Sequence, residues 1–346
     1  MGAYMEQVRL GRTGLSVSRS GFGAIPIQRI GLEHAKRLLR TAYDRGINFF
    51  DTARSYTDSE EKIGFALSHV RKDIVIATKT PATDRNGALK DVETSLRNLR
   101  TDYIDIYQLH NPAALPDPSD AMSAYAALLE AKKQGKIRFI GITNHRLGLA
   151  REAIASGLYD TIQYPLSELA SDADLEVIED CRKHDLGVIA MKALAGGLLT
   201  NAAAAFAFLR QYENVVPIWG MQTESELDEF LRYEKQPPVL DKKMWQIIEQ
   251  DRAALAGSFC RACGYCMPCP AGIPIPMAAR MPLLLRRMPF QQFMKDEWHK
   301  QMMLIKDCQD CGHCKEQCPY HLDTPALLRA AFDDYEAFYK DHHPRD

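Results

Sequence analysis

The stretch LEHAKRLLRTAYDRGINFFDTA, residues 32–53, contains one expected helix followed by one expected strand. Its first part, residues 32–46, has the apolar spacing of an amphipathic helix and ends at a glycine, which commonly stops helices. Its second part, NFFDTA at 48–53, is an apolar run of the kind found in strands that are buried on both faces of a parallel sheet. We therefore expect an α/β protein in which parallel strands alternate with helices.

Eight strand candidates of this kind occur before residue 233, and most are followed by a helical pattern. They are SGFGAI (20–25), NFFDTA (48–53), IVIATK (74–79), IDIYQLH (104–110), IRFIGIT (137–143), TIQYP (161–165), GVIAMKA (187–193) and VVPIWG (215–220). Eight such units are typical of a (β/α)8 TIM barrel, and residues 7–21 predict an N-terminal β-hairpin that closes the barrel bottom. A doubly wound sheet is the alternative, but GFG (21–23) is too short for the glycine-rich dinucleotide loop.

The composition limits the classes of partner. The 346 residues include 43 Lys and Arg against 45 Asp and Glu, so we expect no nucleic-acid partner. No apolar run reaches the ~18 residues that span a bilayer, so we expect no membrane partner. The N-terminal MGAYMEQVRLGRTG lacks the apolar core of a signal peptide, and we therefore expect a cytoplasmic protein.

Four polar side chains stand at or just after the ends of neighbouring expected strands. Asp51 ends the second strand, and Tyr56 follows it in the next loop. Lys79 ends the third strand and His110 ends the fourth. Because catalytic groups of TIM barrels lie at the carboxyl ends of the strands, we expect these four side chains to meet there.

Together these residues can deliver a proton. A tyrosine with its usual pKa of about 10 is a poor acid at neutral pH, and a neighbouring ammonium group lowers that pKa. Lys79 would act on Tyr56 in this way while Asp51 holds Lys79 in place. His110 would donate a hydrogen bond to a carbonyl oxygen on which negative charge develops. The alternative is a structural Asp51–Lys79 ion pair beside a core histidine, and the position of all four at strand ends favours catalysis.

Several of these motifs resemble a known family. GINFFDTARSYTDSEEKIG (46–64), TK (78–79), QLH (108–110) and GITN (141–144) are similar to motifs of the aldo/keto reductases. The resemblance covers about residues 5–233 and implies a TIM barrel in which hydride moves between a nicotinamide cofactor and a carbonyl. It implies that Tyr56 is the general acid and that Asp51 and Lys79 tune it. It also implies that His110 orients the substrate carbonyl.

The resemblance also implies a cofactor site, formed by Gly23, Ala24, Thr143, Asn144, Gln163, Met191, Lys192, Gly220, Gln222 and Glu226. Thr143, Asn144 and Gln163 would bind the nicotinamide carboxamide. Met191 stands where the family often has an aromatic ring, and Lys192 would meet a phosphate. Glu226 stands where the family often has Arg or Gln, and an anionic side chain repels a 2′-phosphate. The choice between NADH and NADPH stays open.

Eight of the nine cysteines lie in two runs, CRACGYCMPCP at 260–270 and CQDCGHCKEQCP at 308–319. Since cytoplasmic thiols are kept reduced, clustered cysteines indicate metal ligands rather than disulfides. The second run fits the ferredoxin pattern C-x2-C-x2-C-x3-C-P, and the first has one residue fewer before its last cysteine.

In two-cluster modules of this type, the fourth cysteine of each run ligates the other cluster. The runs therefore predict two [4Fe-4S] clusters with crossed ligand sets. Cluster one would use Cys260, Cys263, Cys266 and Cys318, and cluster two would use Cys308, Cys311, Cys314 and Cys269. Structural zinc is the alternative, but the third close cysteine and the Cys-Pro step in each run favour iron–sulfur.

We thus expect a TIM barrel over residues 1–233, a linker and helix over 234–256, and a small α-helical ferredoxin-like domain over 257–346. The whole chain resembles a subgroup of aldo/keto reductases with such a C-terminal dicluster domain. This implies an NAD(P)-dependent oxidoreductase that interconverts a small-molecule aldehyde or ketone with an alcohol.

Two alternatives stay open. One is an electron-transfer protein whose clusters serve a ferredoxin or other redox partner, and the other is a dinucleotide sensor without turnover. Nicotinamide delivers two electrons as hydride, each cluster carries one, and the sequence shows no sign of a flavin to convert between them. A structural, regulatory or docking role of the clusters is therefore favoured.

Overall fold

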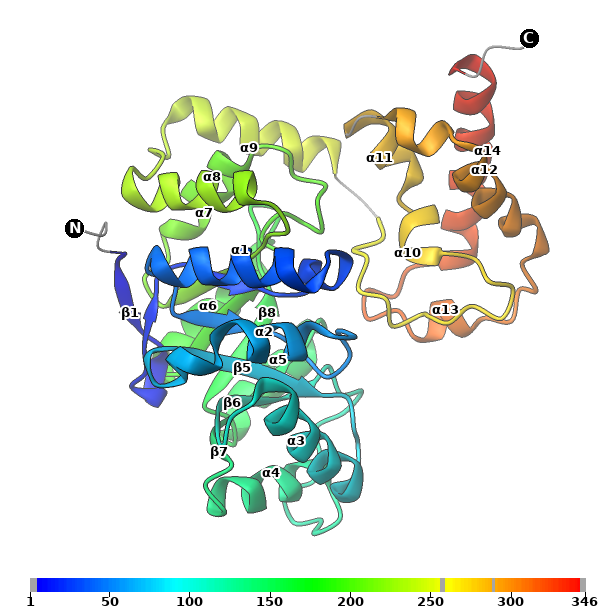
Figure 1. Cartoon of the computed structure of the whole chain (residues 1–346). Coiled ribbons are helices and arrows are strands. Elements are labelled where there is room, and N and C mark those ends of the chain that lie inside the picture. Colours follow the sequence, from blue (N-terminus) through cyan, green and yellow to red (C-terminus); the bar gives the residue numbers. More distant parts are fainter. Residues whose placement is uncertain (1–4, 256–258, 288–289, 343–346) are drawn as a thin grey trace. The chain divides into compact units, whose positions relative to one another are not determined.

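The computed structural model describes residues 5–255, 259–287 and 290–342 (Figure 1). The chain divides into two compact units. The first runs through Ala193 and resumes over Ala203–Ile248; the second comprises Leu194–Ala202 and the chain from Glu249 onward. The domain boundaries expected at 233 and 257 stay predictions, and residues 1–4, 256–258, 288–289 and 343–346 lie outside the described part.

The first unit contains a closed barrel of eight parallel strands. They are β3 (Gly21–Gly23), β4 (Phe49–Asp51), β5 (Val75–Thr80), β6 (Ile104–His110), β7 (Ile137–Thr143), β8 (Thr161–Pro165), β9 (Gly187–Met191) and β10 (Val215–Gly220). They follow one another in chain order around the barrel, and β10 closes it against β3. The TIM barrel is confirmed, and the doubly wound alternative is wrong.

Helices alternate with these strands and lie around them (Figure 1). They are α1 (Leu32–Asp44), α2 (Ser59–Leu67), α3 (Arg85–Leu99), α4 (Ala124–Lys133), α5 (Leu147–Ser156), α6 (Asp172–Lys183), α7 (Ala202–Arg210) and α8 (Glu224–Lys235). Short 3-10 helices add Pro26–Arg29 and Ser68–Asp73. Polar side chains start several of these helices by accepting bonds from free backbone N–H groups, as Asp84 does from Gly87 N at 2.9 Å.

An N-terminal hairpin closes one end of the barrel, as expected. Strands β1 (Gln7–Arg9) and β2 (Ser16–Ser18) pair antiparallel around a 3-10 turn at Gly11–Thr13. Leu10, Leu15 and Val17 share one buried cluster with barrel residues such as Phe49 and Ile106. Gly11 lies so close to β9 that an added Cβ would be 2.1 Å from Gly187 N, so only glycine fits there.

The second unit is helical. Its elements are α10 (Ile275–Ala278), α11 (Met281–Arg287), α12 (Asp296–Met303), α13 (His313–Glu316) and α14 (Thr324–His342), with 3-10 turns at Phe290–Met294 and Leu304–Asp307. Helix α9 (Lys242–Ala254) runs from the first unit into the second. The buried face of α14 contributes Leu328 and Tyr335, and the Tyr335 hydroxyl donates to Phe293 O at 2.9 Å. Helices α11 and α12 lie between the two cysteine runs, in keeping with the small α-helical domain expected there.

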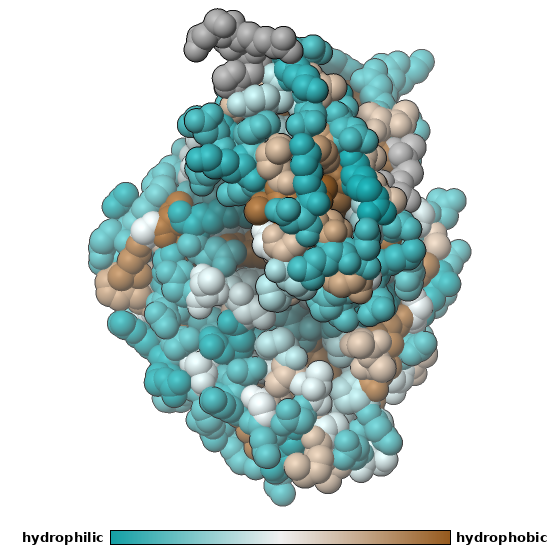
Figure 2. All heavy atoms as spheres, turned by 90° about the vertical axis from the view of Figure 1, so that its right-hand side faces the viewer, coloured by the Kyte–Doolittle hydropathy of each residue, from teal (hydrophilic) through white to brown (hydrophobic). Residues whose placement is uncertain are grey.

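Among the described helices, none is long and apolar enough to cross a membrane. Figure 2 shows one face of the molecule, on which hydrophilic side chains predominate and apolar side chains form small groups.

Candidate functional site

The carboxyl ends of β4 and β5 hold a buried ion pair. Lys79 Nζ donates to both carboxylate oxygens of Asp51 at 2.8 Å and to Thr52 O at 2.5 Å. Only 1% of the Lys79 side chain and 2% of the Asp51 side chain are exposed. Burial lowers the pKa of Lys79 and raises the pKa of Asp51, while the charge of each partner opposes the other's shift. The pair therefore places an ammonium group in a site from which water is excluded.

Tyr56 and His110 lie beside this pair. Lys79 Nζ is 5.2 Å from the centroid of the Tyr56 ring and over its face. The Tyr56 and His110 rings meet edge to face, with their centroids 5.9 Å apart. Burial, and then the Lys79 charge, lower the pKa of His110 to about 3, so this imidazole is neutral near pH 7. The four side chains expected at successive strand ends thus lie together at one end of the barrel.

The register of the barrel strands places several expected cofactor residues next to these four. Gly23 pairs with Asp51 across β3 and β4. Thr143 pairs with His110 across β6 and β7, and Gln163 pairs with Thr143 across β7 and β8. All of these lie at the carboxyl ends of their strands, where barrels bind ligands.

Buried side-chain amides lie between the Asp51–Lys79 ion pair and the other expected cofactor residues. Gln163 Nε2 lies 3.5 Å from an Asp51 carboxylate oxygen, and Gln163 Oε1 accepts from Gln108 Nε2 at 2.9 Å. Asn144 is fully buried, and its Nδ2 donates to Pro112 O at 3.3 Å. The Gln163 amide thus faces the Asp51–Lys79 ion pair from the opposite side of the barrel lumen.

The next expected residues lie at the ends of β3, β9 and β10. Ala24 N donates to Asp51 O at 2.8 Å, and Gly220 pairs with Gly23. Met191 is half-buried at the end of β9, and Lys192 follows it with a left-handed φ of 57°. These positions surround the same end of the barrel as Asp51, Tyr56, Lys79 and His110.

The Glu226 carboxylate caps the start of helix α8, so it does not point outward as a free anion. Its Oε2 accepts from the backbone N–H of Gln222 at 2.8 Å and of Thr223 at 3.0 Å. The Thr223 hydroxyl in turn accepts from Glu226 N at 3.3 Å, which completes a capping box. The backbone N–H groups of Gln222 and Thr223, just before α8, are therefore bonded to the protein's own carboxylate.

Gln108 supports the site and was not predicted from the sequence. It lies two residues before His110 on β6, and side chains two apart on a strand point to the same face. A polar residue in an apolar strand at that spacing is the signal that could have revealed it.

Glu60, on α2, is a second unpredicted support. Its buried carboxylate accepts from the hydroxyls of Thr78 and Ser95, each at 2.7 Å. It thereby anchors α2 to β5 and α3, behind the loop that carries Tyr56. Nothing in the sequence distinguishes it from the neighbouring Glu61, which is exposed.

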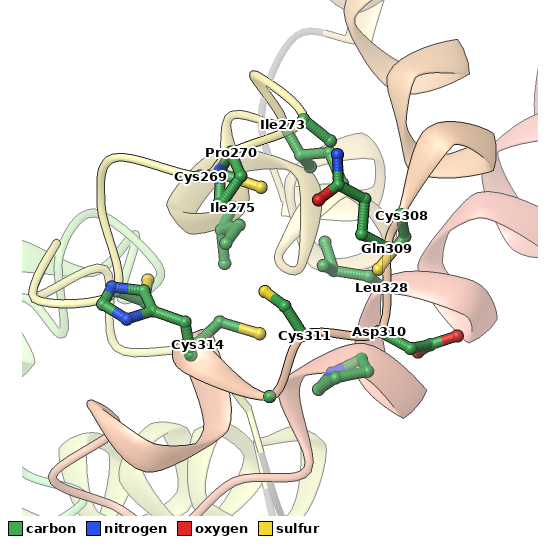
Figure 3. A pocket seen from close by; sticks show the side chains of 15 residues that line it. Cys269, Pro270, Ile273, Ile275, Cys308, Gln309, Asp310, Cys311, Cys314 and Leu328 are labelled. Carbon is green, nitrogen blue, oxygen red and sulfur yellow. The ribbon is translucent and has the colours of Figure 1, made fainter.

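The second unit brings cysteine thiols of both runs around one pocket. Cys266, Cys269, Cys308, Cys311 and Cys314 line it, and Figure 3 shows the sulfur atoms of Cys269, Cys308, Cys311 and Cys314 directed into it. Burial raises the pKa of Cys314, and the nearby Cys308, Cys311 and Cys269 add to the shift. The fourth cysteine of the first run therefore lies with three cysteines of the second run.

The thiols of the first run also lie close to one another. Burial raises the pKa of Cys266 to about 12, with Cys260, Cys263 and then Cys314 contributing. Burial also raises the pKa of Cys260, and the nearby Cys263 and Cys318 add to that shift. Cys318 of the second run thus lies near Cys260 of the first, and Cys266 lies near thiols of both runs. Eight thiols gathered in this way are a suitable donor set for iron–sulfur clusters.

Arg261 helps to hold this second arrangement. Its guanidinium lies 4.5 Å from the Phe259 ring centroid and 4.7 Å from that of Tyr320. Arg261 follows Cys260, and Tyr320 stands two residues after Cys318. These cation–π contacts therefore fasten the segment of Cys318 to the first cysteine run.

The fold and the strand-end residues define an oxidoreductase barrel, and family models agree. The aldo/keto reductase family matches residues 20–205, and a 4Fe-4S dicluster domain matches residues 259–323. The chain belongs to the aldo/keto reductase family and carries an iron–sulfur domain at its C-terminal end. The family uses a nicotinamide cofactor, and the iron–sulfur interpretation of the cysteine runs is supported over zinc.

Individual relatives lead to the same family. The uncharacterized oxidoreductase YqkF of Bacillus subtilis is 32% identical over 215 residues, which are 57% of this chain and 67% of YqkF. The NADH-specific methylglyoxal reductase of Escherichia coli is 30% identical over 227 residues, with 57% and 70% covered. The holo form of aldo-keto reductase AKR11C1 from Bacillus halodurans matches the fold with a TM-score of 0.61 at 24% identity, covering 72% of this chain and 96% of that one.

Proposed function

We propose that the chain interconverts a carbonyl and an alcohol, with Tyr56 as the general acid and base. The observation that carries this proposal is the position of the Tyr56 ring 5.2 Å from the buried ammonium of Lys79. A bound nicotinamide dinucleotide would supply or accept the hydride at the carbonyl carbon. Tyr56 gives its hydroxyl proton to the carbonyl oxygen in reduction and takes that proton back in oxidation.

The remaining residues support this proton transfer electrostatically. The Lys79 ammonium stabilises the phenolate that Tyr56 becomes, and Asp51 holds that ammonium through two hydrogen bonds. His110 is neutral, so it donates one hydrogen bond to the substrate oxygen without competing as an acid. Thr143, Asn144 and Gln163 would hold the nicotinamide amide on the neighbouring strand ends.

The cofactor is NADH in this proposal. The carboxylate of Glu226 accepts from the backbone N–H groups of Gln222 and Thr223 just before α8, and its negative charge would repel a 2′-phosphate. The substrate is a small carbonyl compound, and methylglyoxal is a suitable first probe because it is the named substrate of one NADH-specific relative.

Substitution of the proposed acid tests this function. We expect Tyr56→Phe to lower kcat for carbonyl reduction by about 10²- to 10⁴-fold, the usual contribution of a positioned general acid. The affinity for NADH, followed by its fluorescence, should change little. Tyr103→Phe is the matched control, because Tyr103 lies before β6, at the other end of that strand, and packs on Arg71. Full turnover of Tyr56→Phe would refute the assignment.

Electron exchange with a redox partner is a second candidate, favoured by the position of one ligand. Cys311 is exposed, whereas Cys314 in the same set is buried. A cluster at this place would therefore approach the surface, where a ferredoxin could reach it. Anaerobic titration with NADH under EPR detection separates the two functions. Reduction of a cluster by NADH supports electron exchange, and carbonyl reduction without a cluster signal supports the enzyme alone.

A further inference from the structure

The loop Leu194–Ala202 follows β9 directly but belongs to the cysteine-bearing unit. Two arginines of that unit hold its backbone. Arg280 Nη2 donates to Gly196 O at 2.8 Å, and Arg287 Nη1 donates to Leu198 O at 2.7 Å. The chain thus runs from Met191 and Lys192, at the end of a barrel strand, straight into a segment fixed by the second unit.

Arg280 and Arg287 differ in whether a carboxylate pairs with the guanidinium group. Arg287 Nη2 donates to the Asp251 carboxylate at 2.7 Å, so its charge is paired. Arg280 has no carboxylate partner among the described ion pairs and is 4% exposed, and its Nε has no hydrogen-bond partner in the described residues. A buried guanidinium with an unused N–H needs an anionic or acceptor neighbour.

The first cysteine run is the neighbour of the Arg280 guanidinium. Burial lowers the pKa of Arg280, and the nearby Cys260 opposes that shift. A Cβ added to Gly196 would lie 3.4 Å from Arg280 Nη1, 3.7 Å from Arg261 O and 4.0 Å from the Ala262 Cβ. The loop, the guanidinium and the Cys260 segment therefore pack together within one unit.

We propose that Arg280 is a positioning residue that couples the iron–sulfur cluster on Cys260 to the backbone of the loop Leu194–Ala202. Thiolate ligands make the environment of a cluster anionic, and one added electron increases the negative charge beside Arg280. Hydrogen bonds and charges near the sulfurs set the reduction potential of such a cluster. An electron added to such a cluster would therefore attract the Arg280 guanidinium more strongly. Because this guanidinium donates to Gly196 O, the loop would be held more tightly as well.

Two measurements test this coupling without reference to turnover. The first is an EPR-monitored titration of the holoprotein with dithionite, which supplies single electrons, and the second is hydrogen exchange of the loop amides. We expect Arg280→Gln to lower the potential of one cluster and to speed exchange at Gly197 and Leu199, whose N–H groups bond to Leu194 O. Reduction should slow this exchange in the wild type and leave it unchanged in Arg280→Gln.

Arg287→Gln is the matched control, because Arg287 holds the same loop but pairs with Asp251. It should speed loop exchange and leave both potentials at their wild-type values. Arg280→Lys keeps the charge and serves if Arg280→Gln assembles poorly; its potential should stay near that of the wild type. Equal potentials in the wild type and Arg280→Gln, or loop exchange that ignores cluster reduction, would overturn the proposal.

Discussion

At the scale of single residues, the proposed active site depends on the burial of one ion pair. Lys79 and Asp51 are both almost fully buried, and two hydrogen bonds join them. Removing either partner would leave an uncompensated buried charge, which typically costs about 3–5 kcal/mol. The Thr52 carbonyl fixes the third ammonium position. The ammonium is therefore held at one place next to the Tyr56 ring.

The neutral state of His110 leads to a prediction about stability and pH. Its folded pKa is about 3, because burial and the Lys79 charge disfavour the imidazolium, whereas an unfolded histidine has a pKa of about 6.5. Below pH 6.5 the unfolded chain binds more protons at this site, so stability falls with pH down to about pH 3, by at most about 1.4 kcal/mol per unit. Above pH 6.5 this contribution is constant.

Urea unfolding at pH 7, 6 and 5 checks this. His110→Gln should lose less stability on acidification than the wild type, since glutamine cannot take up the proton. His69→Gln removes an exposed histidine and should follow the wild type. Parallel curves for His110→Gln and the wild type would show that His110 titrates normally.

At the scale of elements, the sequence predicted the regular strands. It did not predict the contacts between segments that are far apart along the chain. All eight strands appear where their apolar runs predicted them, because a strand buried on both faces must be apolar along its length. The strand ends also brought Asp51, Lys79 and His110 together as expected. No local pattern marks Leu194–Ala202 as part of the second unit, since its partners Arg280 and Arg287 lie some 90 residues on.

Helix α8 carries a prediction about cofactor choice. The Thr-x-x-Glu spacing of Thr223 and Glu226 is the signature of a capping box, so the local role of Glu226 was visible in the sequence. Glu226→Gln keeps the cap and removes the charge, whereas Glu226→Ala removes both. We expect the wild type to bind NADH more tightly than NADPH. In both variants, the ratio of NADH affinity to NADPH affinity should be smaller than in the wild type. Only Glu226→Ala should also lower the free energy of unfolding, by about 1 kcal/mol.

Dissociation constants for the two dinucleotides and urea unfolding measure these effects. Glu224→Gln is the control, because Glu224 lies in the same first turn but pairs with His34 at the surface. Its ratio of NADPH to NADH affinity should equal that of the wild type. Tighter binding of NADPH than NADH by the wild type would contradict this role of Glu226.

At the scale of the whole molecule, the last prediction concerns how the two cysteine runs share clusters. The structure groups Cys318 with Cys260, and Cys269 with Cys314, so each set draws on both runs. Two [4Fe-4S] clusters give about eight irons per chain, and loss of one cluster leaves about four. If the sets are crossed, Cys260→Ser/Cys318→Ser removes two ligands of the same cluster and still retains about four irons.

The double variant Cys314→Ser/Cys318→Ser should lose nearly all iron, because crossed sets place these two cysteines in different clusters although they are four residues apart. Ligand sets confined to one run each predict the reverse result for the two double variants. Iron and sulfide assays on anaerobically prepared protein distinguish the outcomes, with Cys181→Ala as the control, since that cysteine is fully buried in α6 of the barrel unit. With crossed ligation, each cluster would join cysteine ligands that lie some fifty positions apart in the sequence.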